Sequence, residues 1–362
     1  MIARSTRATR RATAVAGVAA TAALLAGCAQ ELPTPSADEP FTGPVLTLDQ
    51  EVAVVEDVAA VLEEAEAEAS PKLLRERVAG PAFEVRRSQI EVAAELDDDS
   101  FVTRIPTDLA ATIIPTTETW PRVSYTITQP TENLEAHRMV AYQQESAREN
   151  YKLWLWVQLI PGTTMPNFAD PEAIGSEAVA ADDDSLEVTP AEALVQYADL
   201  VAQGDDSDYA DAFELPEDSQ DLVKRVQADA RNLRGSEGFE EADGRYRLTY
   251  AARDDDPVAV RTSDGGAVVM GALDGNVRID VEEDGSIAPF TQTQTALMDG
   301  DDETNELYVE YTDQVALYIP PAGSGEPVRP LGYSHDTVTA ANEFPSERNT
   351  DREEPEESEE SE

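Results

Sequence analysis

The side chains that most often carry catalysis are scarce in this chain of 362 residues, which holds two histidines and one cysteine. Ser334, His335 and Asp336 are consecutive and include the three residue types of a hydrolytic triad. Successive residues of a strand face opposite sides of a sheet, so we expect no proton relay among these three. His137 is the other histidine, and two histidines are too few for a typical zinc site. The sequence therefore predicts no catalytic constellation, no metal centre and no cofactor.

Carboxylate oxygens, which are the ligands that calcium prefers, are abundant by comparison. Short acidic runs occur at residues 97–99, 182–184, 205–206, 254–256 and 301–303. Because 74 of the residues are acidic, such runs arise easily, and none has the spacing of a helix-loop-helix calcium loop. Solvated loops are the preferred interpretation, and loose calcium binding is the alternative.

The most distinctive surface expected from the sequence is an aromatic strand at residues 152–160. Alternation predicts two apolar faces, one with Leu153, Leu155, Val157 and Leu159 and the other with Trp154, Trp156, Gln158 and Ile160. One face packs on helices. The other either packs as core or forms a ligand groove containing Trp154, Trp156 and Tyr142 of the neighbouring strand.

The start of the chain has the pattern of an export signal. Four arginines precede an apolar run of about 16 residues, which ends in Leu25-Ala26-Gly27-Cys28. The segment resembles a bacterial lipoprotein signal with its lipobox. That resemblance implies removal of the signal and acylation of Cys28, with palmitate-like chains that hold the protein on the extracytoplasmic face of the cell membrane. A plain secretory signal and a single membrane anchor are the alternatives, but the run is shorter than the roughly 20 residues of a spanning helix.

The charge balance restricts the possible partners. Asp and Glu number 74 against 26 Lys and Arg, and the formal net charge is −48. Nucleic acid is excluded as an expected partner because phosphate binding needs a basic face. Anionic lipid repels such a protein, which favours a tether between the acylated cysteine and the folded body.

Changes in composition divide the chain into six segments. They are a lipoprotein signal peptide (1–27), a Pro-rich acidic tether (28–44), a first α+β domain (45–166), a linker (167–188), a second α+β domain (189–345) and a disordered acidic tail (346–362). In the second domain, Asp-Gly pairs at 264–265, 274–275 and 284–285 predict the hairpin turns of a β-meander.

The fold class predicted from this order is α+β, with two tandem domains. In each domain, helices precede strands, so we expect helices packed on one curved antiparallel sheet. Nuclear-transport-factor-like and cystatin-like folds are the nearest analogies, and an analogy of fold carries no function.

Three short motifs carry a second resemblance. They are Trp120-Pro121-Arg122, Tyr151-Lys152-Leu153-Trp154 and Pro161-Gly162-Thr163-Thr164-Met165-Pro166. Together with the lipobox and the acidic tether, they resemble large actinobacterial cell-envelope lipoproteins of unknown function. The resemblance implies an envelope location and a role not yet assigned, and it offers no catalytic residues to carry over.

Three functions follow as hypotheses, of which the least favoured is an enzyme that uses carboxylates on a substrate such as a glycan. The first is a non-catalytic binding or scaffolding module of the cell envelope, anchored through acylated Cys28 and contacting an envelope protein. The second is a carrier or receptor for a small lipid, peptide or glycan, using a pocket in one α+β domain. An open pocket with convergent polar groups favours the second hypothesis, and filled cores favour the first.

Overall fold

A computed structural model describes residues 43–130, 136–255, 257–298 and 305–344. The expected signal peptide, Cys28 and the acidic tail lie outside these residues, as does most of the tether. Within them, no helix has the length and apolar character needed to cross a membrane.

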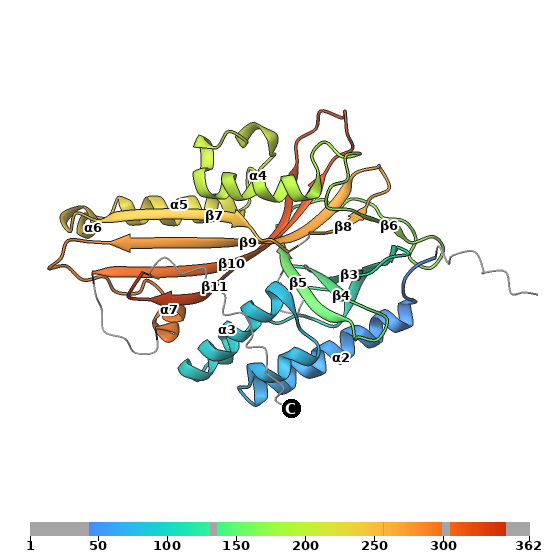
Figure 1. The fold of residues 1–362 in the computed structure, drawn as a ribbon, viewed down its shortest axis with the longest axis horizontal. Helices are drawn as coiled ribbons and strands as arrows, with labels where there is room; N and C mark the ends of the chain where they lie inside the picture. The colour runs from blue at the N-terminus through green and yellow to red at the C-terminus, as the bar shows by residue number, and fades with distance from the viewer. Residues whose placement is uncertain (1–42, 131–135, 256, 299–304, 345–362) are drawn as a thin grey trace, which may run out of the picture. The chain divides into compact units, whose positions relative to one another are not determined.

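The strands of the described residues all belong to one sheet. They are β1 (Leu109–Ile113), β2 (Pro115–Thr116), β3 (Arg122–Thr128), β4 (Arg138–Gln144), β5 (Lys152–Leu159), β6 (Ser176–Val179), β7 (Arg245–Ala252), β8 (Val258–Arg261), β9 (Ala267–Asp280), β10 (Glu306–Ile319) and β11 (Arg329–Ala341). Their hydrogen-bonded order is β1-β3-β4-β5-β11-β10-β9-β8-β6-β2, and β7 also pairs with β9. The two end strands, β1 and β2, are separated in the chain only by Ile114, so the sheet curls into a nearly closed barrel (Figure 1).

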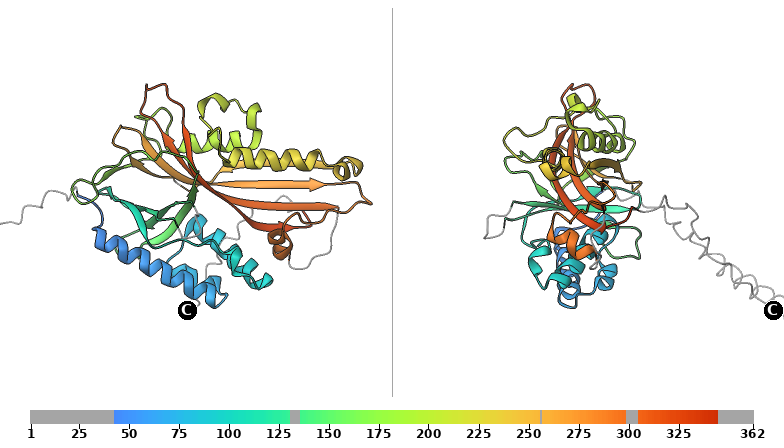
Figure 2. Two further views of the ribbon diagram at one scale, coloured as in Figure 1. Left: turned by 180° about the vertical axis from the view of Figure 1, so that it is seen from behind. Right: turned by 90° about the vertical axis from the view of Figure 1, so that its left-hand side faces the viewer.

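The helices of the described residues lie outside this barrel. They are α2 (Leu48–Ala67), α3 (Gly80–Leu96), α4 (Pro190–Gln203), α5 (Leu222–Arg234), α6 (Glu237–Glu241) and α7 (Gln292–Leu297), with 3₁₀ turns η1 (Pro71–Glu76), η2 (Asp99–Phe101), η3 (Gly204–Asp206) and η4 (Ala210–Ala212). Figure 2 shows α2 and α3 on one side of the sheet and α4 and α5 on the other. Thr47 and Thr189 cap α2 and α4, because each hydroxyl accepts a hydrogen bond from the amide three residues later.

The prediction of two tandem helix-on-sheet domains is wrong, and so are the nuclear-transport-factor-like and cystatin-like analogies that depend on it. β5 pairs with β11 through Leu159 and Gly332, which joins the two expected sheets into one. Residues from both halves also share the barrel interior, where Met139, Leu155 and Val157 pack with Val268, Met270 and Ala316. Each half has a second apolar face, and each buries that face against the other half, which removes more apolar surface from water than two separate sheets would.

Two of the three expected hairpin turns are wrong, and the first is Asp284-Gly285, which lies in the long connection that holds α7 between β9 and β10. Asp264-Gly265 forms the turn between β8 and β9, but Asp274 and Gly275 lie in the middle of β9, which continues to Asp280. A Cβ on Gly275 would lie 2.6 Å from the ring of Tyr250 on β7. The glycine is therefore explained by the close approach of this tyrosine, and not by a turn.

A β-bulge changes the expected faces of β5. Opposite β4, Ala141 pairs with Leu155 and Tyr142 pairs with Leu153, so Trp154 is the extra residue. Leu153 consequently packs with Trp156 under α2 and α3, whereas Leu155 and Val157 face the barrel interior. The simple alternation expected for Leu153 and Trp154 fails because the bulge shifts the register by one residue.

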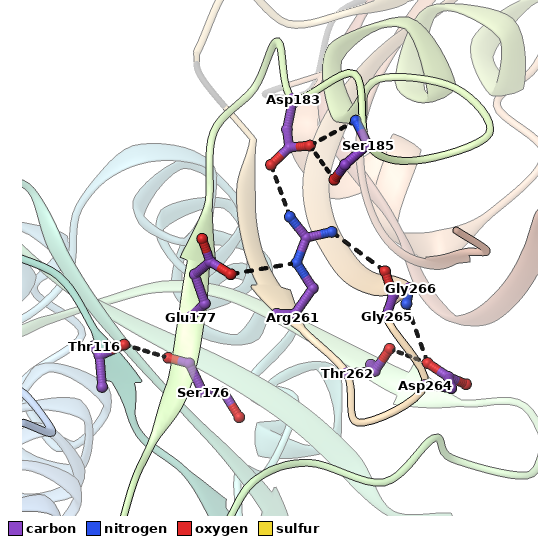
Figure 3. A network of polar contacts seen from close by, with 10 residues as sticks. All are labelled: Thr116, Ser176, Glu177, Asp183, Ser185, Arg261, Thr262, Asp264, Gly265 and Gly266. Atoms are coloured by element: carbon purple, nitrogen blue, oxygen red, sulfur yellow. Dashed lines mark hydrogen bonds and ion pairs between the residues drawn. The ribbon is translucent and has the colours of Figure 1, made fainter. Parts of the chain in front are cut away.

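One predicted acidic run has a structural role at the barrel wall. Asp183 accepts a hydrogen bond of 2.7 Å from Arg261 at the end of β8, and Glu177 of β6 lies 3.7 Å from the same guanidinium (Figure 3). Hydrogen bonding by Ser185, with a smaller contribution from Arg261, holds the pKa of Asp183 below its usual value. This run therefore ties the loop after β6 to β8.

Candidate functional site

The candidate site lies where β5 and β11 separate. In the described residues, Leu159 pairs with Gly332 and Gln158 with Tyr333, and the amide of Ile160 donates to the carbonyl oxygen of Leu331 over 2.9 Å. Two residues before Gln158 on β5, the amide of Trp156 donates instead to the side-chain oxygen of Gln314, over 2.9 Å. The strands leave a cleft of about 580 Å³ beside this point, which we call the β5–β11 cleft.

The lining of the β5–β11 cleft is mostly polar and comes from distant parts of the chain. It consists of Thr103, Arg138, Trp156, Gln158, Leu159, Ile160, Pro161, Asp218, Ser219, Gln220, Arg225, Tyr333, Ser334, His335 and Asp336. Arg138 comes from β4, Arg225 from α5 and His335 from β11. The cleft thus requires the joining of both halves of the barrel.

At its wall, His335 forms a buried pair with Asp313 of β10. The imidazole Nδ1–H donates to Asp313 Oδ1 over 2.8 Å, and Tyr250 O–H donates to Asp313 Oδ2 over 2.8 Å. The Tyr311 ring stacks on the imidazole with centroids 4.4 Å apart. With Nδ1 carrying the proton, Nε2 is the nitrogen that accepts. The pair fixes the tautomer and the ring orientation of His335.

The neighbours of His335 have other partners. Ser334 Oγ accepts from Gln314 Nε2 over 3.1 Å, and Asp336 Oδ1 accepts from Gln89 Nε2 over 2.9 Å. Burial raises the pKa of Asp336 above its usual value. Ser334, His335 and Asp336 thus have different hydrogen-bond partners in Gln314, Asp313 and Gln89, and hydrogen bonding by Ser334 offsets part of the effect of burial on the pKa of Asp336. Sequence reasoning did not pair His335 with Asp313. The two residues can be recognised as neighbours only once β10 and β11 are known to lie side by side, because a cross-strand pair is not visible in one strand alone.

An arginine lies beside the indole of Trp156. The Arg86 guanidinium lies 5.2 Å from the ring centroid and donates to Glu66 over 3.2 Å. Burial lowers the pKa of Arg86 to about 10, so it stays positively charged at neutral pH. Arg138 lines the cleft on the adjacent strand, where Val140 pairs with Trp156.

A second hollow, of about 750 Å³, adjoins the cleft and is more apolar. We call it the mouth hollow. It is lined by Ile127, Ala136, His137, Arg138, Gln158, Leu159, Ile160, Pro161, Gly162, Thr163 and Met165. Ile127 and Leu159 belong to the barrel-interior cluster, and Met165 packs against it. Because Arg138 and residues 158–161 line both spaces, the two hollows meet at this segment.

The structure does not bring the three expected groove residues together as one open wall. Tyr142 and Trp156 are packed in the cluster under α2 and α3, and Trp156 also lines the β5–β11 cleft. Trp154 packs instead against the barrel-interior cluster, and a side chain on Gly80 would collide with its ring. Cys28 lies outside the described residues, and within those residues no group of three or more His, Cys, Asp or Glu could hold a metal ion.

Comparison with known proteins supplies a family and no activity. A family model described as Domain of unknown function (DUF8094) matches residues 42–342. No curated protein and no solved structure matches the chain. The family model covers both halves of the barrel, as the shared sheet requires.

Proposed function

The chain belongs to the DUF8094 family, and we propose that it is a non-catalytic, lipid-anchored binding protein that takes a small ligand in the β5–β11 cleft. The observation that carries this proposal is the cleft of about 580 Å³, into which charged and hydrogen-bonding side chains from β4, α5 and β11 converge. Its volume lies within the range of small-molecule sites, roughly 300–1,000 Å³, and its lining is more polar than is usual for them. The cleft therefore favours a carrier or receptor over a scaffold with filled cores alone.

The location is the second part of the proposal. The lipobox-like segment that ends at Cys28 and the resemblance to actinobacterial envelope lipoproteins support an anchor on the extracytoplasmic face of the cell membrane. A single acyl chain holds a protein only weakly, at about 0.8 kcal/mol per buried CH₂, so several chains on one cysteine suit stable anchoring. The net charge of −48 supports a body kept away from anionic lipid and free of nucleic acid.

Photo-cross-linking in intact cells tests the binding site. A photoreactive residue at Gln220, which is exposed and lines the cleft, is compared with one at Glu172, which is exposed elsewhere. We expect a small-molecule adduct, seen as a mass increase of the intact protein, at Gln220 only. Equal adducts at both positions, or an adduct at neither, contradict the proposed site.

Intact mass spectrometry of native material tests the anchor independently. The expected mass is that of a chain beginning at Cys28 and carrying acyl groups, and Cys28→Ser should move the protein from the membrane fraction to the soluble fraction. A retained amino terminus or an unmodified thiol contradicts this part of the proposal.

A further inference from the structure

We propose that the ligand of the β5–β11 cleft is an uncharged polyhydroxyl molecule, of the class of a short oligosaccharide. This inference rests on the proposed binding function, and it names the chemical class of the ligand. Three features of the cleft carry it: side chains that both donate and accept hydrogen bonds, a balance of positive and negative charge, and an aromatic ring in the wall.

The side chains of the cleft that are open to a ligand both donate and accept. Gln158 of β5 and Gln220 are exposed, and their amides have no hydrogen-bond partner among the described residues. The hydroxyl of half-buried Tyr333 on β11 is also without a partner there. An amide group and a phenol each offer a donor and an acceptor, so these three side chains can pair with a ligand group of either kind.

His335 adds an acceptor in a fixed position. Its Nδ1–H donates to Asp313, whereas Nε2 is bonded to no described residue and is not buried. His335 and Arg225 line the β5–β11 cleft and also a smaller space of about 210 Å³ that continues from it. Nε2 can therefore accept from a ligand hydroxyl where the two spaces meet, and together the spaces offer room for more than one sugar ring.

The charges of the cleft balance. Among the described residues, two arginines and two aspartates line it. Arg138 already has an interaction within the chain, and Asp336 accepts from Gln89. The other two, Arg225 and Asp218, are exposed, opposite in sign and without an ion-pair partner among the described residues. The cleft thus favours neither an anion nor a cation, which is the electrostatic complement of an uncharged ligand.

A hydroxyl is the ligand group that can pair with every one of these side chains. It donates to Asp218 and to Nε2 of His335, it accepts from Arg225, and it does both with an amide. A carboxylate on the ligand could not pair with the acceptors, and an ammonium group could not pair with the donors. Neighbouring hydroxyls of a sugar also suit the paired atoms of a guanidinium or a carboxylate.

Tyr333 supplies an apolar surface for a sugar ring. Its ring packs against the apolar cluster that α4 and α5 form with the sheet, and it also lines the cleft. The face of an aromatic ring is negative, so the C–H groups of a sugar pack favourably on it. Gln158 pairs with Tyr333 across the two strands, which places a hydrogen-bonding amide beside this ring.

Calorimetric titration of the full chain carrying Cys28→Ser tests the inference. The probes are maltotriose, cellotriose, mannotriose, galactotriose and chitotriose, with trialanine and octanoate as probes of other classes. We expect at least one trisaccharide to bind at least tenfold more tightly than trialanine and octanoate. Its affinity should change less than twofold between low and high salt, because screening acts on charges and the ligand has none.

Substitutions in the cleft locate the binding. Gln158→Ala, Arg225→Gln and Tyr333→Leu should each weaken binding of that trisaccharide at least fivefold, and the leucine keeps an apolar side chain against the α4 and α5 cluster. Arg231→Gln is the matched control, because Arg231 is an exposed arginine of the same helix as Arg225 and lines neither space. It should leave binding unchanged, and the thermal midpoint of every variant shows whether it is folded.

Three results overturn the inference. Equal binding of trialanine or octanoate, or no binding of any trisaccharide at millimolar concentration, overturns the polyhydroxyl class. An affinity that falls steeply with salt overturns the uncharged ligand. Unchanged binding in all three cleft variants places the sugar outside the cleft.

Failure of this inference differs from failure of the proposed function. If no trisaccharide binds but a small-molecule adduct forms at Gln220 in cells, the site stands and the ligand class is wrong. If no trisaccharide binds and no adduct forms, both proposals are wrong.

Discussion

Two buried carboxylates lie on the outer faces of the same barrel, and their surroundings differ. Asp313 of β10, packed on the side of α4 and α5, accepts from His335 and Tyr250. Glu51 in the first turn of α2 is equally buried, but no hydrogen bond of ordinary length reaches its oxygens from the described residues. Burial raises the pKa of Glu51 to about 7, and the nearby Ser124 hydroxyl offsets only part of that effect.

The difference shows what donors do for a buried carboxylate. Those of Asp313 replace the water that it loses and fix an imidazole at the wall of the cleft. Around Glu51 the hydroxyls of Ser124, Thr126 and Tyr151 also have no hydrogen-bond partner among the described residues, and the protonated acid is the favoured form near neutral pH. The hydrogen bonds to Asp313 position a side chain of the cleft. The burial of Glu51 without such bonds makes the packing of α2 on the sheet sensitive to pH.

The largest expected effect comes from removing the carboxylate that has partners. Asp313→Ala leaves His335 and Tyr250 buried without their acceptor, and we expect a loss of about 3–5 kcal/mol in the free energy of unfolding. Urea denaturation at pH 7 measures it, with exposed Asp205→Ala as the control. A loss below about 1 kcal/mol would show that the stability of the fold does not depend on the hydrogen bonds between Asp313 and these two residues.

A smaller effect of opposite sign is expected at the other carboxylate. The pKa of Glu51 is higher in the folded chain, about 7, than its usual 4.5, so its ionisation destabilises the fold as pH rises from 4.5 towards 7. Glu51→Gln should therefore stabilise the protein at pH 8 by about 1–3 kcal/mol relative to its effect at pH 4. Urea denaturation at both pH values measures the difference. The same effect of the substitution at both would mean that Glu51 does not titrate in this range.

The last comparison is between two tyrosines, one beside each carboxylate. Tyr250→Phe removes a donor from buried Asp313 and should cost about 1–3 kcal/mol, whereas Tyr151→Phe removes a hydroxyl that has no partner among the described residues and should cost almost nothing. Thermal unfolding of the two variants side by side measures this contrast. Equal losses would remove the distinction between the two regions.

Local features of the fold were predictable from the sequence, but the joining of the two half-sheets into one barrel was not. The caps of α2 and α4 and the strand at residues 122–128 follow from patterns within a few residues. The pairing of Leu159 with Gly332 has no such pattern, because both strands also suit a separate sheet. Gly275 shows the same limit, since an Asp-Gly pair predicts a turn and the approach of Tyr250 decides otherwise.

The candidate site follows the same division. Trp156 was singled out because an aromatic strand with two apolar faces is visible in the sequence, and the structure places it at the cleft. Trp154 and Tyr142 were grouped with it by alternation, which the bulge at Trp154 interrupts. His335 was considered only with its chain neighbours, although Asp313, 22 residues away, is its partner.

By itself, the amino-acid sequence determined the helix starts, most strand positions, the strongly acidic character and the scarcity of catalytic residue types, since each depends on composition or short-range periodicity. Only the tertiary structure decided that two half-sheets share one barrel interior and that Arg138, Arg225 and His335 meet at one cleft. The physical reason is that backbone hydrogen bonding between strands is independent of residue type. The choice among possible edges is made by which apolar faces bury one another.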